Sequence, residues 1–282
     1  MRRLLISFAA TFAVALPVFV LAARGGSPPA ATEAAAALPP APTPNASTDQ
    51  RIGVLQATVK AAPKRADGWT LLAGAYLQKV RETGDAGFYA RAEGAVDRAL
   101  RLRPDDAGAL TQRSALELSR HDFKAGLRDA LRARALAPAV VAPFGTVVDA
   151  LVELGRYPQA ERALQQMVER KPNLAAYARV SYFRELHGDL DGALAAMRAA
   201  ASAGGAAPEQ DAYVRALLGG LELQKGRIGS AVRQYREALQ AVRGYPAAEA
   251  GLAQAVDDRG RGQQSERRHH PRQRAANGGD PR

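Results

Sequence analysis

The stretch DAGALTQRSALELSRHDFKAGLRDALRARALAP, residues 106–138, is followed by VAPFGTVVDALVELGRYPQAERALQQMVERKP, residues 141–172, and the two align without a gap. Each reads as a helix, a turn and a second helix that ends at a proline. Pro104, Pro138 and Pro172 are spaced by 34 residues. A fixed period of this length is typical of stacked helical repeats, in which a hairpin buries its apolar stripe only against its neighbours.

Further units can be followed on both sides of this pair. Trp69, Leu72 and Tyr76 are spaced to share one face of a first helix. The segment LQKVRETGDAGFY after this helix holds about seven extra residues, which predict either a loop at the rim or a lengthened first helix. About five repeats therefore fill residues 50–260, and an amphipathic half-repeat that ends at Pro63 begins them.

The period and the W-x2-L-x3-Y spacing of Trp69, Leu72 and Tyr76 resemble the tetratricopeptide repeat (TPR). The resemblance implies an all-α, right-handed α-solenoid of stacked helix-turn-helix repeats. It further implies that first helices line a concave face and second helices a convex one. Members of this family serve as protein–protein interaction scaffolds, and we expect that role here.

Catalysis has no support in the sequence, and we expect neither an enzyme nor a bound cofactor. The absence of cysteine excludes disulfides and thiolate metal sites. The histidines His121 and His187 fall in predicted turns, and His269 and His270 fall in the C-terminal tail. No pair has metal-ligand spacing inside a predicted helix.

The N-terminal 24 residues predict a signal peptide or a signal anchor. Arg2 and Arg3 precede 20 uncharged residues, 4–23, and Arg24 follows. This length favours a membrane-spanning anchor, whereas Pro17 and the small residues around Ala22 favour cleavage near Ala22. Both interpretations stay open. The positive flank places the remainder outside the cytoplasm under either of them.

Two segments outside the repeats are predicted to be disordered. Residues 25–49 are rich in alanine and proline and form a linker. Residues 261–282 are basic and hold no apolar side chain larger than alanine, so they cannot pack. Two origins of this tail stay open, a genuine extension and the product of a truncation or frameshift.

The formal net charge of +11 is spread over the leader, the repeats and the tail. Within the repeats, the basic side chains fall mostly on predicted second helices: Arg98, Arg101, Arg103, Arg128, Arg132 and Arg134. A basic convex face of this kind suggests an alternative role as a peripheral assembly or stability factor that docks on lipid. Nucleic-acid binding is disfavoured, because no aromatic side chains alternate with the arginines.

Helical spacing assigns a second set of side chains to the concave face. This candidate ligand-binding set is neutral to acidic and consists of Asp149, Glu153, Tyr182, Glu185 and Tyr213. The set predicts an extended protein or peptide partner that is neutral or basic rather than acidic. If Asp149 lines this face, Asp149→Ala leaves the fold intact and weakens only ligand binding.

Overall fold

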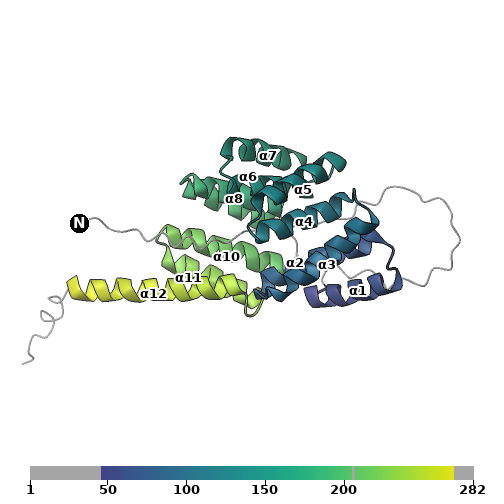
Figure 1. Cartoon of the computed structure of the whole chain (residues 1–282). Helices are drawn as coiled ribbons and strands as arrows, with labels where there is room; N and C mark the ends of the chain where they lie inside the picture. The colour runs from purple at the N-terminus through teal and green to yellow at the C-terminus, as the bar shows by residue number, and fades with distance from the viewer. Residues whose placement is uncertain (1–45, 205–206, 270–282) are drawn as a thin grey trace, which may run out of the picture. The chain divides into compact units, whose positions relative to one another are not determined.

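The computed structural model of the chain describes residues 46–204 and 207–269, in which every regular element is an α-helix (Figure 1). The predicted leader, most of the predicted linker and the last part of the tail, 270–282, lie outside these residues. The helices are α1 (Thr48–Ala61), α2 (Ala66–Thr83), α3 (Gly87–Leu102), α4 (Ala107–Ser119), α5 (Phe123–Leu136), α6 (Ala142–Glu153), α7 (Tyr157–Arg170), α8 (Leu174–Leu186), α9 (Leu190–Ser202), α10 (Pro208–Gln224), α11 (Ile228–Ala241) and α12 (Pro246–His269).

The helices form antiparallel pairs in sequence order, as expected for TPR-like repeats. The pairs are α2 with α3, α4 with α5, α6 with α7, α8 with α9, and α10 with α11, and α1 supplies the predicted half-repeat. The described chain divides into two compact units. Unit 1 comprises residues 46–81 and 85–179, and unit 2 comprises residues 82–84 and 180–269.

In unit 1, consecutive helices from α3 to α7 pack on one another, and α4 also packs on α6. Helix α4 contacts both α5 and α6, so the first helix of one pair lies on the first helix of the following pair. At the start of the unit, Ile52, Leu55 and Val59 of α1 join Leu72 and Tyr76 of α2 in one buried cluster. The half-repeat therefore covers an apolar surface that α2 would otherwise expose.

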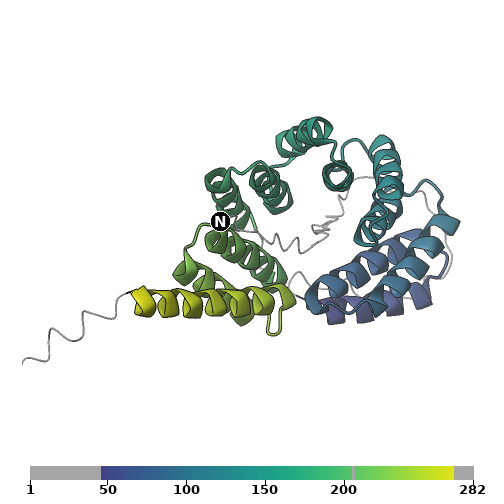
Figure 2. The same cartoon turned by 60° about the vertical axis from the view of Figure 1, so that its left-hand side comes forward.

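Unit 2 repeats this arrangement with α10, α11 and α12. Helix α12 packs on both α10 and α11, and Figure 2 shows it as the straight yellow helix beside its green neighbours. Tyr235 of α11 is buried in this seam, and burial raises its pKa to about 12. The ring lies so close to Gly219 and Gly251 that a Cβ atom on either residue would clash with it. Glycine is required at both positions.

The turn inside a pair has one construction throughout. Gly155, Gly188 and Gly226 each adopt a positive φ just after a first helix, at 68°, 79° and 72°. This left-handed conformation closes the end of the helix and reverses the chain. His121 takes the same place between α4 and α5 with φ of 63°. A residue with a Cβ atom is costly in this conformation. Because His121 adopts it all the same, the turn position matters more than the residue type.

The extra residues after Trp69 lengthen a helix and do not form a loop. Helix α2 extends over 18 residues, and only three residues separate it from α3. Of the two predicted alternatives, the lengthened first helix is therefore the one that the structure has.

Helix α1 begins slightly earlier than predicted, inside the segment assigned to the linker. Ser47 caps it, because its Oγ accepts from the Gln50 amide at 3.2 Å and Gln50 Oε1 accepts from the Ser47 amide at 2.9 Å. This reciprocal pair satisfies two amides at the helix start.

The C-terminal part differs from the sequence prediction, which ended the repeats at Gly260 and placed a disordered tail after it. Helix α12 continues without a break to His269. An ion pair between Asp257 and Arg261, one turn apart, supports this extension. The sequence that follows is rich in glutamine, arginine and glutamate, which have high helix propensity.

Among the described residues, no helix combines the length and the apolar character needed to cross a bilayer. The hydrophobic segment 4–23 lies outside these residues.

Ala130→Arg is expected to lower the free energy of unfolding by several kcal/mol. Ala130 is fully buried in the seam between α5 and its neighbours, so arginine would overpack the seam and bury an unpaired charge. Arg128→Ala, on the exposed side of the same helix, is the matched control and should change the stability by less than about 0.5 kcal/mol. Urea denaturation followed by circular dichroism measures both, and equal effects would contradict the assigned seam.

Candidate functional site

The five side chains predicted to bind a ligand lie on first helices, but they do not form one exposed set. Asp149 and Glu153 are on α6 in unit 1, whereas Tyr182 and Glu185 on α8 and Tyr213 on α10 are in unit 2. All five are partly buried. Their surroundings decide what each can do.

Asp149 is committed to an internal ion pair. Arg179 of α8 donates from Nε to Asp149 Oδ1 at 2.8 Å and from Nη2 to Oδ2 at 2.7 Å. Only 2% of the Arg179 side chain and 12% of the Asp149 side chain are exposed. Burial raises the pKa of the Asp149 carboxyl, and the positive charge of Arg179 opposes this shift. Asp149 therefore does not offer a free carboxylate to a ligand.

Arg179 makes two further hydrogen bonds, which fix the position of its guanidinium. Its Nε also donates to the Gly145 carbonyl at 3.2 Å, and Nη1 donates to the Ala175 carbonyl at 3.0 Å. A Cβ on Gly145 would lie 2.8 Å from the guanidinium carbon, so the missing side chain of Gly145 makes room for the guanidinium. A planar guanidinium can satisfy a carboxylate and two carbonyls at once.

The first-helix surface of unit 2 is better placed for a ligand. Glu185 of α8 accepts a hydrogen bond from Gln224 of α10, which ties the two first helices together on this side. Tyr182 and Tyr213 are partly exposed on the same two helices. Tyr213 also packs against the buried cluster of α10, α11 and α12 and its hydroxyl is buried, so only part of its ring is available on this surface. The binding role of Tyr182, Glu185 and Tyr213 stays a prediction.

A second cluster of charged side chains, not singled out in the sequence analysis, lies between α4 and α5. Arg113 donates from Nη2 to Asp129 Oδ1 at 2.9 Å, and Glu117 lies one turn after Arg113 on α4. One carboxylate oxygen of Glu117 is buried without a hydrogen-bond partner. Burial, with the nearby negative charge of Asp129, raises the pKa of Glu117 to about 7.

Burial also raises the pKa of Glu153, the remaining predicted residue of unit 1. The negative charge of Asp149 adds to this shift, and the proximity of His121 opposes it. The sequence signal that could have indicated the raised pKa of Glu117 and Glu153 was a charged residue at a core position of a helix. Nowhere in the described part of the chain do three or more histidine, aspartate or glutamate side chains meet in a metal-binding arrangement.

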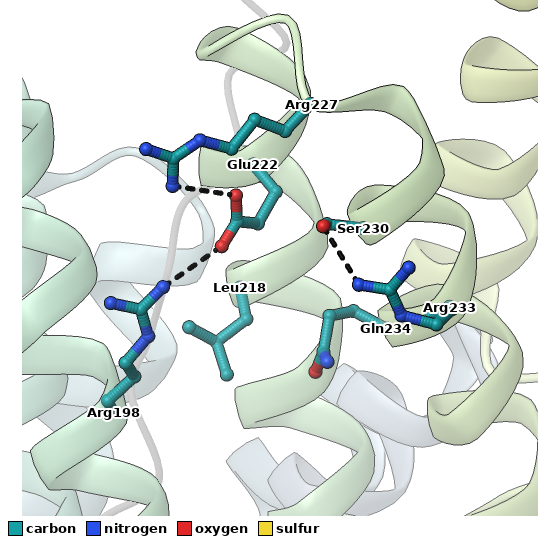
Figure 3. A pocket seen from close by; sticks show the side chains of 7 residues that line it. All are labelled: Arg198, Leu218, Glu222, Arg227, Ser230, Arg233 and Gln234. Atoms are coloured by element: carbon teal, nitrogen blue, oxygen red, sulfur yellow. Dashed lines mark hydrogen bonds and ion pairs between the residues drawn. The ribbon is translucent and has the colours of Figure 1, made fainter.

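Two hollows lie between consecutive second helices, one in each unit, and neither was predicted from the sequence. In unit 2, a hollow of about 350 Å³ opens between α9, α10 and α11 (Figure 3). It is lined by Arg198, Leu218, Glu222, Arg227, Ser230, Arg233 and Gln234. We call it the arginine hollow.

The hollow of unit 1 has a volume of about 310 Å³ and lies between α5, α6 and α7. It occupies the same place in the repeat, because Arg156 directly follows Gly155 as Arg227 directly follows Gly226. Its inner side chains are apolar, and they are Leu127, Leu131, Val147 and Leu151. We call it the leucine hollow.

Asp149→Ala is expected to destabilise the fold by about 3–5 kcal/mol, since it leaves the buried Arg179 without its counter-charge. The expectation that this change would leave the fold intact is thus wrong on the geometry of the pair. Asp149→Ala combined with Arg179→Met should recover most of the loss, because no buried charge then remains. Denaturant titration of the two single variants and the double variant measures the coupling, and additive effects would contradict a buried pair.

The free energy of unfolding is expected to fall as the pH rises from 4.5 to about 7. In this interval the folded state keeps the proton on Glu117, whereas the unfolded chain, with the ordinary pKa of 4.5, releases it. Because the side chain is partly solvated, the loss should be only about 1 kcal/mol. Glu117→Gln should remove this part of the pH dependence. Parallel urea titrations at the two ends of the interval measure it, and an unchanged slope in the variant would exclude Glu117 as its source.

Comparison with known proteins establishes the fold. No protein-family model matches the sequence, and no curated protein matches it significantly. Among solved structures, a thermophilic TPR protein from Thermus thermophilus matches with a TM-score of 0.55 and 23% identity, over 60% of this chain and 91% of that one. A TPR protein from Parabacteroides merdae matches with a TM-score of 0.59 and 14% identity, over 74% and 78%.

The APC/C hetero-tetramer Cut9–Hcn1 matches with a TM-score of 0.60 and 12% identity, over 75% of this chain and 40% of that one. At these sequence identities, the structural similarity shows a shared fold and does not identify a binding partner. The paired helices, the left-handed turn residues and the small-residue seams agree with it in unit 1 and in unit 2. The chain therefore has the fold of tetratricopeptide-repeat proteins.

Proposed function

We propose that the chain is a non-catalytic scaffold of the cell envelope that binds an extended peptide or partner protein along its first helices. The observation that carries this proposal is the surface shared by α8 and α10. There, the partly exposed Tyr182 and Tyr213 lie on the same two first helices as Glu185, whose carboxylate also accepts a hydrogen bond from Gln224. Peptides are often held in this way, by aromatic contact and a few oriented polar groups.

The proposed ligand is neutral or basic, as the composition of this surface suggests. Glu185 is the carboxylate on it, and Tyr182 and Tyr213 offer ring faces that can receive a lysine or arginine side chain. Asp149 is left out of the proposal, because Arg179 already neutralises it.

The envelope location rests on the N-terminal sequence. Residues 4–23 would hold the chain in a membrane, or residues up to about Ala22 would be removed after export. In both cases the repeats would lie outside the cytoplasm.

Docking on lipid through the second helices is the weaker alternative, and ion pairing argues against it. Arg103 pairs with Asp67 at 2.8 Å and with Asp106 at 2.9 Å, and Arg132 pairs with Asp105. These carboxylates offset part of the positive charge that an anionic membrane surface would attract.

A photo-crosslinking amino acid at position 213 should capture a partner in the native host, and mass spectrometry should map the crosslinks to an extended stretch of that partner. Adding Glu185→Lys should reduce this yield about tenfold, because it reverses the charge that attracts a basic segment. The same crosslinker at position 236, on the exposed side of α11, is the control. Equal adducts at both positions, or no effect of Glu185→Lys, would contradict the proposal.

A further inference from the structure

The arginine hollow holds more positive charge than its own carboxylate can balance. Arg198 of α9 donates from Nη2 to Glu222 Oε1 at 3.1 Å, and Arg227 donates from Nη1 to Glu222 Oε2 at 3.2 Å (Figure 3). Arg233 donates to Ser230 Oγ at 2.9 Å. Two guanidinium groups thus bind Glu222 and a third, that of Arg233, lines the hollow beside Ser230, so three positive charges line a hollow with one carboxylate and leave an excess of two.

The neighbouring charges do not remove this excess. Asp191 is close enough for Arg227 and Arg198 to lower its pKa, but its main partner is Lys225, which balances it. Within the described residues, Nε and Nη1 of Arg198 and Nε and Nη2 of Arg227 have no hydrogen-bond partner in the protein. The hollow thus offers directed donors as well as charge.

Glu222 gives these donors a fixed position. Its side chain is only 10% exposed at the inner end of the hollow, whereas those of Arg198 and Arg227 are 60% and 48% exposed. The carboxylate holds one N–H of each guanidinium and leaves the other N–H groups of both available. A guanidinium that is already oriented loses less conformational entropy when it binds an anion.

The leucine hollow indicates that the fold does not need this charged interior. Leu151 lies four residues before Gly155, as Glu222 lies four residues before Gly226, so the two residues hold equivalent places. Arg156 and Arg162 likewise correspond to Arg227 and Arg233. An apolar residue fits at the inner position and avoids the cost of burying a carboxylate there. The charged interior of the arginine hollow is therefore better explained by a ligand than by stability.

We propose that the arginine hollow binds two neighbouring carboxylate side chains of an acidic polypeptide segment. Two carboxylates match the excess of two positive charges, and the planar guanidinium fork matches their geometry. A volume of about 350 Å³ equals that of about a dozen water molecules, close to the ten heavy atoms of two glutamate side chains. A single phosphate ion would leave much of this space unfilled.

This inference does not rest on peptide binding by α8 and α10. It adds a second surface on the side of the second helices, with the opposite charge preference. A partner could contact each surface with a different segment.

The test uses the full chain and a fluorescein-labelled hexaglutamate peptide, followed by fluorescence anisotropy at about 100 mM salt. R233E places a negative charge in the hollow and should weaken binding at least about tenfold. R236E makes the same change in net charge on α11, at an exposed residue that does not line the hollow, and should weaken binding less than about twofold.

Equal losses in R233E and R236E, or equal binding of hexaglutamine, would reduce the effect to general charge and overturn the proposal. Displacement by inorganic phosphate as effective as by unlabelled hexaglutamate would also overturn it, in favour of a site for small oxyanions. Thermal unfolding verifies that R233E folds, and R233A replaces it if it does not. Crosslinking at position 213 reports on the other surface, so failure of either proposal can be recognised separately.

Discussion

A helical hairpin is too small to bury its own apolar stripe, and the rest of this structure depends on that constraint. Each pair must lie against the next one, so helices such as α4 and α6, or α10 and α12, contact each other directly. Close contact requires small side chains at the crossing points. Alanine and glycine fill these places, and the fully buried Ala130, Ala163 beside α6 and the two glycines around Tyr235 are examples.

The features that depend on local sequence could be predicted. The 34-residue period located the helix pairs, and Gly155, Gly188 and Gly226 at their turns are the residue type that a left-handed turn favours. Pro158 lies in the first turn of α7, a position that proline favours. These signals sit within a few residues of the structure they specify, because helix ends are determined by local backbone conformation.

The features that depend on distant residues could not be predicted. Asp149 has the spacing of a surface residue on α6, and only the position of Arg179, 30 residues later, places it in a buried pair. The same holds for Glu222, whose arginine partners come from α9 and from the turn before α11. Helical spacing assigns a residue to one side of its own helix but does not say which charged side chain from another helix will cover it. The length of α12 was missed for a different reason, since local propensity and one ion pair extend it without packing.

The two hollows share their backbone position and two arginines, and differ at two other lining positions. Leu131 and Leu151 line one, and Arg198 and Glu222 line the other. The repeat scaffold therefore separates the residues that maintain the architecture from those that determine what the hollow accepts. Exchanging the side chains at these two lining positions would convert an apolar hollow into a polar one without moving any helix. Such a layout allows partner preference to diverge between duplicated units by point substitution alone, at little risk to folding.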